Sequence, residues 1–432
     1  MTLSSLLWHV GRMTPPPLST LTRSFLRIGW LSFGGPAGQI AQMQRELVDG
    51  RGWIEQAAFL RALNFCMLLP GPEAQQLATW CGWRLHGVRG GLIAGGLFVL
   101  PGAAVMALLT WAYLNFGTLP LVQALFYGVQ AVVLAVVAQA LLRIAQRALH
   151  GVQGWALAVA AFVALFFFDA PFPLVVLAAA LIGGWRGRGN APDLTPLPPA
   201  SWRTSLVTAL GWAAVWIAPI LLSALVLGAQ HPLTQLGGFF ARMAAVTFGG
   251  AYAALSYVAQ HAVEDQGWLT AAQMLDGLGL AETTPGPLVL VFQFVGGIAG
   301  AGFGIAHGLW LGMAMVLWVT FAPSFLWIFT LAPHLDRLTA RPALAAALAA
   351  ITAAVVGVMA NLALWFALHV LFAEVDVLRV GPLRLWVPSG GFDWVASGLA
   401  LAALGLLTRT RIGMGAVLGL GALAGVLIKY LA

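Results

Sequence analysis

Charged residues are scarce in this sequence. Of its 432 residues, 8% are charged and 60% are hydrophobic, whereas soluble domains carry roughly 25% charged residues. Several apolar runs are longer than the roughly 18 residues that indicate a membrane-spanning helix. The composition therefore argues against a water-soluble fold and predicts a multi-pass, all-α integral membrane protein embedded in the lipid bilayer.

Lysine, cysteine and metal-binding motifs are also scarce. Lys429 is the only lysine, so the net charge of +7 comes from arginines. These lie in short loops between apolar runs, where they set membrane orientation and do not indicate a nucleic-acid partner. Cys66 and Cys81 are too few for a disulfide framework or a thiolate metal site. The histidines lack HxxxH or HExxH spacing, and no nucleotide-binding or hydrolase motif stands in a suitable context. The sequence thus predicts no metal, no cofactor and no enzymatic activity.

Two motifs occur twice, at a constant shift. The stretch Ser32-Phe33-Gly34-Gly35 recurs as Thr247-Phe248-Gly249-Gly250, and 247 − 32 = 215 positions separate the copies. The same shift carries Gly52-Trp53 onto Gly267-Trp268 and Pro70-Gly71-Pro72 onto Pro285-Gly286-Pro287. Glycine and proline interrupt apolar sequence at each of these places. Interrupted hydrophobic segments at matching places in two halves indicate the binding site of a transporter.

Longer apolar runs fill the rest of each half. The expected spans are residues 92–115, 119–142, 152–168, 171–184, 205–227, 305–332, 344–372, 394–407 and 412–431. We expect residues 373–393 to form a polar loop. The chain divides into an N-terminal lead (1–20), a first repeat (21–184), a basic linker with one extra span (185–236) and a second repeat (237–432).

Loop arginines predict how the two halves are oriented. Arg143, Arg186, Arg341 and Arg409 lie in loops that the positive-inside rule places in the cytoplasm. The single span between the halves then turns the second half over, which gives two inverted-topology repeats. The broken segments fit either re-entrant hairpins or full crossings. Hairpins are favoured, because residues 21–90 are basic and the matching stretch is acidic.

The breaks carry the candidate chemistry. Each break creates a helix N-terminus, whose free N–H groups and partial positive charge bind anions. Four such ends near the middle of the membrane suit a small oxyanion. Close helix packing is the alternative role for these glycines, but two kinds of break at one spacing favour a site. The predicted binding residues are Ser32, Phe33, Gly34, Gly35, Pro70, Gly71, Pro72, Thr247, Phe248, Gly249, Gly250, Thr284, Pro285, Gly286 and Pro287, with Gln76 as a neutral donor.

Four charged residues near the breaks each have two interpretations. Arg27 and Arg242 correspond under the shift and either guide the anion or extend to the membrane surface as anchors. Arg45 either contacts the anion or pairs with the aspartate one turn later. Glu73 either stabilises the first turn of its helix, which is favoured, or couples transport to protons.

The doubled motifs resemble those of the chromate ion transporter (CHR) family in its long, two-domain form. The resemblance implies a bacterial inner-membrane protein that exports chromate, a tetrahedral dianion similar to sulfate, and confers chromate resistance. A carrier of sulfate or another small anion is the alternative, and a membrane enzyme or assembly subunit is a more distant one. Exporting a dianion against an inside-negative potential releases roughly 4.6 kcal/mol per 100 mV. Potential-driven export, proton coupling and a homodimer all stay open at this point.

Overall fold

All regular secondary structure described in the first half and in the helix that follows it is helical. The computed structural model describes residues 15–33, 35–189, 202–248, 250–335, 338 and 341–431. The first half contains α1 (Leu18–Leu31), α2 (Gly35–Gln44), the π-helical turn η1 (Arg45–Gly50), α3 (Gln56–Cys66), α4 (Glu73–Phe116), α5 (Pro120–Ala148), α6 (Gly151–Phe168), α7 (Phe172–Arg186) and η2 (Gly187–Gly189). The linking helix is α8 (Trp202–Leu227).

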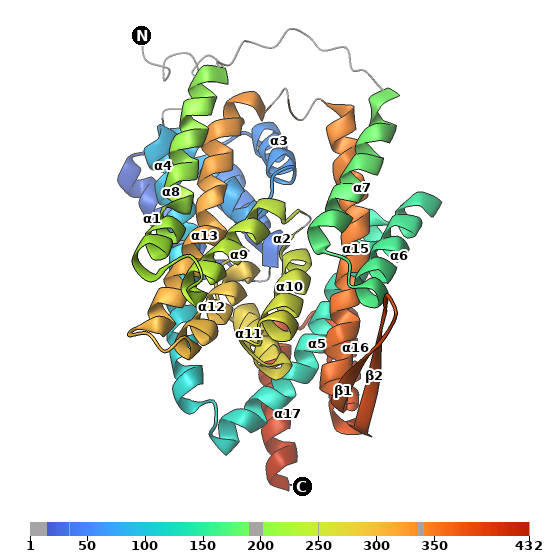
Figure 1. Cartoon of the computed structure of the whole chain (residues 1–432). Helices are drawn as coiled ribbons and strands as arrows, with labels where there is room; N and C mark the ends of the chain where they lie inside the picture. Colours follow the sequence, from blue (N-terminus) through green and yellow to red (C-terminus); the bar gives the residue numbers. More distant parts are fainter. Residues whose placement is uncertain are drawn as a thin grey trace.

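The second half begins in the same way and adds two strands (Figure 1). Its elements are α9 (Pro232–Val246), α10 (Ala251–Gln260), the π-helical turn η3 (His261–Asp265), α11 (Ala271–Thr283), η4 (Leu288–Leu290), α12 (Val291–Gly302), α13 (Gly308–Leu331), η5 (Ala332–His334), α15 (Pro342–Leu371), β1 (Phe372–Val380), β2 (Leu383–Phe392), α16 (Trp394–Arg409) and α17 (Met414–Leu431).

Six helices among the described residues are long and apolar enough to cross a membrane, namely α4, α5, α6, α8, α13 and α15. α7, α16 and α17 are shorter apolar helices. Together these nine helices cover the nine segments that the sequence predicts as spans. The prediction of a helical, multi-pass membrane protein is therefore confirmed.

The repeated motifs give the same backbone twice. Under the 215-residue shift, α1 and α2 fall on α9 and α10, and the π-helical turn η1 falls on η3. Gly71 and Gly286 have φ angles of 110° and 96°, a region that residues with a side chain rarely adopt. Gly35 and Gly250 likewise have φ angles of 71° and 99°. The repetition in sequence is thus also a repetition in local structure.

α4 consists of two antiparallel helices. The backbone leaves helical geometry at Gly87, where φ is 60°. Gly82 and Gly90 then lie against each other, so closely that a methyl group on either would collide with the main chain of the other. Residues 73–85 therefore run back along residues 88–116. Gly300 and Gly308 make the same kind of contact between α12 and α13 in the second half.

Reciprocal hydrogen bonds lock α8 to α13. Pro219 and Pro323 interrupt these helices, and each leaves the carbonyl four residues earlier without its helical donor. The carbonyl of Val215, four residues before Pro219, accepts a bond from Trp318 Nε1 at 3.0 Å. The carbonyl of Val319, four residues before Pro323, accepts one from Trp216 Nε1 at 2.9 Å. Each carbonyl that a proline deprives of its donor is thus satisfied by the neighbouring helix, as membrane-embedded backbone requires.

The expected polar loop at residues 373–393 is instead an antiparallel hairpin of β1 and β2, so the prediction of a loop here was wrong, although the rest of the regular structure among the described residues is helical. Apolar and charged residues alternate here as they do in half-exposed strands, and Gly381 supplies the turn at φ 60°. Arg384 on β2 is 4% exposed. It pairs with Asp169 after α6 at 3.0 Å and with Glu264 in η3 at 2.9 Å. The hairpin therefore links the end of α6 in the first half to the end of the α10 segment in the second.

Candidate functional site

The breaks of the two halves bond to each other. The Gly71 N–H donates to the Thr247 carbonyl at 2.9 Å, and the Gly286 N–H donates to the Ser32 carbonyl at 2.8 Å. Donors and acceptors both correspond under the 215-residue shift. The two bonds are therefore one contact repeated about a local pseudo-two-fold axis. The four predicted breaks meet at one place, although Ser32 and Gly286 are 286 − 32 = 254 positions apart in the chain.

Each Pro-Gly-Pro sequence ends one helix and starts another. The glycine turns the chain at a positive φ, and the second proline precedes the first helical residue. Pro72 stands before α4 and Pro287 before η4, and neither helix start has a side-chain cap. α10 begins after Gly250 and also lacks a side-chain cap. Three helix starts with free N–H groups therefore face the crossing.

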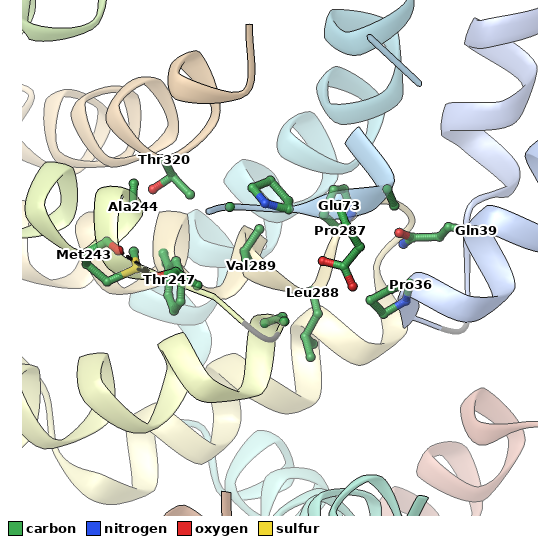
Figure 2. Close-up of a pocket in the computed structure, with 16 residues that line it drawn as sticks. Pro36, Gln39, Glu73, Met243, Ala244, Thr247, Pro287, Leu288, Val289 and Thr320 are labelled. Carbon is green, nitrogen blue, oxygen red and sulfur yellow. Dashed lines mark hydrogen bonds between the residues drawn. The ribbon is translucent and has the colours of Figure 1, made fainter. Parts of the chain in front are cut away.

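A small cavity lies where the breaks meet (Figure 2). Its volume is about 20 Å³, room for about one water molecule. Polar side chains of Gln39, Glu73, Thr247 and Thr320 line it together with apolar residues. A tetrahedral anion fits only if the surrounding helices move apart.

Eight of the predicted binding residues lie at the cavity or at the crossing beside it. Those that line the cavity are Gly71, Pro72, Thr247, Gly250 and Pro287. Ser32, Pro70 and Gly286 lie at the crossing through their carbonyls, which accept bonds from Gly286, Gln76 and Gln39 respectively. Gly35 turns the chain into α2. Gly34 and Gly249 lie outside the described residues.

Four predicted residues point elsewhere. Phe33 is 49% exposed. Phe248 packs against the hydrophobic cluster formed by α6, α7 and α15. The Thr284 hydroxyl donates to the carbonyl of Leu280 in its own helix at 2.7 Å. The Pro285 carbonyl faces Gly102, which allows α4 to pass close to the break. None of these four residues lines the cavity.

Glu73 occupies the middle of the cavity. It is the first residue of α4, and Figure 2 shows its carboxylate between Leu288 and Pro36. A methyl group on Gly250 would lie 4.0 Å from Glu73 Oε1, so the carboxylate faces the start of α10 in the other half. Within the described residues, no cationic side chain lies within 4.0 Å of this carboxylate.

Buried polar atoms without partners surround the crossing. Those without a hydrogen bond in the described structure are Ser32 Oγ, Gln39 Oε1, Gln76 Oε1, Thr320 Oγ1 and Ser324 Oγ, and all five residues are at most 4% exposed. An unpaired buried polar group costs roughly 1–3 kcal/mol. Several at one place indicate a position for water or a polar ligand.

Sequence reasoning missed three of these residues. Gln39 lies one turn into the helix that follows the first break. Thr320 and Ser324 flank the proline inside α13. A proline with hydroxyl residues on both sides, within a spanning run, was the signal that pointed to the last two.

Arg27 and Arg45 share a second cavity, of about 340 Å³, which Gln42 and Glu46 also line. Within the described residues neither arginine forms an ion pair. The alternative pairing of Arg45 with Asp49 is not formed. The helix becomes π-helical at Arg45, so residues four apart no longer lie one turn apart.

Arg242, the counterpart of Arg27, is placed differently. Its Nε donates to the Gly238 carbonyl of its own helix at 3.2 Å, and the residue is exposed. Arg242 lines neither the cavity at the crossing nor the one that Arg27 and Arg45 share.

Broken helices that meet inside a bundle of spanning helices define a class of membrane transport proteins. The chain matches the family model described as "Chromate transporter" over residues 19–184 and 234–426. It therefore belongs to the chromate transporter family, whose members are transporters and not enzymes.

Several curated proteins are similar to the chain over most of its length. A "Chromate transport protein" of Pseudomonas aeruginosa is 33% identical over 398 residues, which cover 89% of this chain and 88% of the relative. One of Cupriavidus metallidurans is 31% identical and covers 79% of this chain and 80% of its own length. An "Uncharacterized transporter" of Methanocaldococcus jannaschii is 25% identical, over 82% of this chain and 86% of its own length. No solved structure matches the chain significantly.

Proposed function

We propose that this protein is a secondary transporter that exports chromate across the bacterial inner membrane and binds it where the four breaks meet. The reciprocal bonding of the breaks carries the proposal, because it brings helix starts from both halves to one small cavity. Membership of the chromate transporter family supports chromate as the substrate. The relatives from P. aeruginosa and C. metallidurans are named chromate transport proteins.

The chemistry of the cavity suits an oxyanion. The starts of α4, α10 and η4 supply N–H groups and partial positive charge. The hydroxyls of Thr320 in the cavity, and of Ser32 and Ser324 beside it, have no hydrogen-bond partner in the described structure and can donate to anionic oxygens. Neutral donors of this kind bind a dianion without holding it as tightly as arginines would, and a carrier must also release its substrate.

We further propose that the halves, residues 21–184 and 237–432, are inverted repeats with re-entrant broken segments. Matching junctions support the inversion. α4 meets α5 at the lower end of the molecule, whereas α13 ends and α15 starts at the upper end (Figure 1). The basic ends of α7 and α15 also lie at the upper end, which is then the cytoplasmic side.

The arginine-lined cavity is the proposed entry point. Arg27 and Arg45 are exposed and unpaired among the described residues, so both charges are available to an approaching dianion. Such charges raise the local anion concentration and the association rate. Arg242 bonds to its own helix, so we assign it the anchoring role instead. The positive face then lies on the side from which an exporter takes its substrate.

Sulfate transport on the same scaffold is the second candidate. The cavity offers hydroxyls and backbone N–H groups, which recognise charge and tetrahedral shape. None of these groups discriminates by chemistry between chromate and sulfate. The substrate must therefore be measured.

Flux of radiolabelled chromate and sulfate into inverted membrane vesicles tests the proposal. Chromate uptake that rises with an interior-positive potential is expected, with competition by sulfate measured in parallel. Sulfate flux without chromate flux would contradict chromate export and favour the second candidate.

Two threonine variants in α13 test the location of the site. Thr320 lines the cavity and Thr330 does not, yet both hydroxyls are buried and unpartnered. Thr320→Val removes one hydrogen bond to a charged ligand, worth roughly 1.5–3 kcal/mol, so the apparent affinity should fall about 10- to 100-fold. Thr330→Val should leave the affinity unchanged. Equal affinities in the two variants would place the site elsewhere.

A further inference from the structure

We propose that the Glu73 carboxylate occupies the anion position of the empty carrier, so that an oxyanion binds only when Glu73 has taken up a proton. Anion and proton then cross the membrane together, one proton per anion. This inference rests on the proposed function and adds the coupling ion to it. The ionised Glu73 carboxylate thereby competes with the substrate for the same position in the cavity.

The position of the carboxylate is the first observation. Glu73 projects into the cavity and faces the start of α10 across the interface between the halves (Figure 2). That helix start has no side-chain cap of its own. A carboxylate at this place takes the partial positive charge that an incoming anion would otherwise use.

The unpartnered groups around the cavity are the second observation. Gln39 and Thr320 line it, are 1% and 4% exposed, and each has a polar atom without a hydrogen bond. If Glu73 only stabilised the first turn of its helix within a fully packed core, the buried polar side chains beside it should also have all their hydrogen-bond partners. Their unused capacity indicates that a further polar group joins Glu73 here during the transport cycle.

The size of the cavity makes the two anions exclude each other. The cavity holds about 20 Å³ and Glu73 lines it, so an anion that enters when the helices move apart takes the space beside this carboxylate. Like charges within about 4–6 Å disfavour the charged form of a carboxyl group. A dianion that enters therefore requires either that Glu73 is protonated or that it leaves the cavity, and protonation needs no rearrangement of α4. Once protonated, the carboxyl O–H adds a donor to the anion.

Other titratable groups are few around Glu73. Among the described residues lining the cavity, α2, α9, α10, η4 and α13 place no charged side chain there. Cys66 on α3 is a buried thiol close enough to feel the charge of Glu73, and Cys81 on α4 lies near Cys66. The buried carboxyl group of Glu282 on α11 is already bonded to the Tyr252 hydroxyl at 2.7 Å. Glu73 is thus the one carboxyl group of the described cavity lining.

The net charge moved with each anion tests whether a proton crosses the membrane with it. The purified full-length protein is reconstituted in liposomes with a tenfold chromate gradient and equal pH on both sides. Transport of one dianion with one proton moves one net charge, and flux reverses at about 59 mV. Transport of the dianion alone moves two charges, and flux reverses at about 30 mV. For the wild type we expect the first value, and an apparent chromate affinity that falls about tenfold per pH unit once Glu73 is ionised.

Glu73→Gln separates a proton on the protein from a proton on chromate itself. This variant mimics the protonated acid, so its chromate affinity should not depend on pH and its transport should move two charges. If its flux is too low to measure, equilibrium chromate binding at several pH values gives the same comparison. Glu55→Gln is the matched control, because Glu55 is an exposed acid outside the cavity, and it should behave as the wild type.

Each other outcome overturns the inference in a recognisable way. Two charges per anion in the wild type would leave chromate transport intact and remove the coupled proton. One charge per anion in both the wild type and Glu73→Gln would assign the proton to chromate. A wild-type protein that carries neither chromate nor sulfate would refute the proposed function itself.

Discussion

Replacing Gly71 by alanine should weaken the crossing of the two halves. Gly71 has φ 110°, and an alanine there pays roughly 1–2 kcal/mol for left-handed backbone. Its Cβ would also lie 3.1 Å from Gln76 Nε2, which is fixed by a 2.7 Å bond to the Pro70 carbonyl. Loss of that bond adds about 1 kcal/mol. The free energy of unfolding should therefore fall by about 2–3 kcal/mol.

The equivalent change in the second half should cost less. Gly286 has φ 96°, but the nearest atom to an added Cβ is Leu290 Cδ1 at 3.1 Å, the far end of a flexible side chain. Only the backbone cost of roughly 1–2 kcal/mol then applies. The order of the two variants follows from Gln76, which has no polar counterpart in the second half.

Reversible unfolding in mixed micelles measures both variants, with Gly96→Ala as the control. Gly96 lies in α4 with nothing within 4 Å of an added Cβ, so its replacement should stabilise the helix by up to about 1 kcal/mol. The reasoning is refuted if Gly71→Ala is as stable as Gly96→Ala, because the crossing would then tolerate an ordinary backbone. Chromate flux through the surviving Gly71→Ala protein should also be reduced, since the break shapes the cavity.

Three further predictions concern the helix lock, the hairpin and the entry cavity. Trp216→Phe leaves a membrane-embedded carbonyl of α13 without a donor, so unfolding should require about 1–3 kcal/mol less in the same assay. Burial raises the pKa of Glu264 to about 7, so its contribution to stability is full below pH 4.5 and is lost as the pH rises through 7. The free energy of unfolding should therefore fall by about 2–3 kcal/mol over this range, and Glu264→Gln should abolish the fall. Arg27→Gln and Arg45→Gln should each slow chromate association and reduce its salt dependence, whereas Arg242→Gln should do neither. Equal effects of all three substitutions would contradict the proposal that the anion enters through the cavity that Arg27 and Arg45 line.

The spans and the breaks could be predicted because they depend on local sequence. A run of about 20 apolar residues is helical in a membrane wherever it stands. A Pro-Gly-Pro sequence stops a helix and starts the next without help from distant residues. The positive φ angles at Gly71 and Gly286 follow from the same local chemistry. Each of these features depends only on the residues next to it in the sequence.

The composition of the cavity depended on contacts that the sequence does not encode locally. Thr320 reaches the crossing because α13 packs beside α4, whose first residue Glu73 lines the same cavity. Phe33 stands next to a break yet faces outward, since the chain turns there and directs neighbouring side chains to opposite sides. The β-hairpin was not predicted, because its alternation of apolar and charged residues is short and its charges suggested a solvated loop.

The two halves have the same backbone conformation at their breaks but place different side chains in the cavity, and the small size of the cavity explains the difference. Glu73 corresponds to Leu288, and both line the same small space. A second carboxylate at residue 288 would place two like charges in a volume of about 20 Å³, where one of them could not ionise. The backbone crossing needs both halves, because each Pro-Gly-Pro turn bonds to the other half. One half already supplies this carboxylate, so a single acid is the arrangement that the small cavity permits, in agreement with the proposed uptake of one proton per anion.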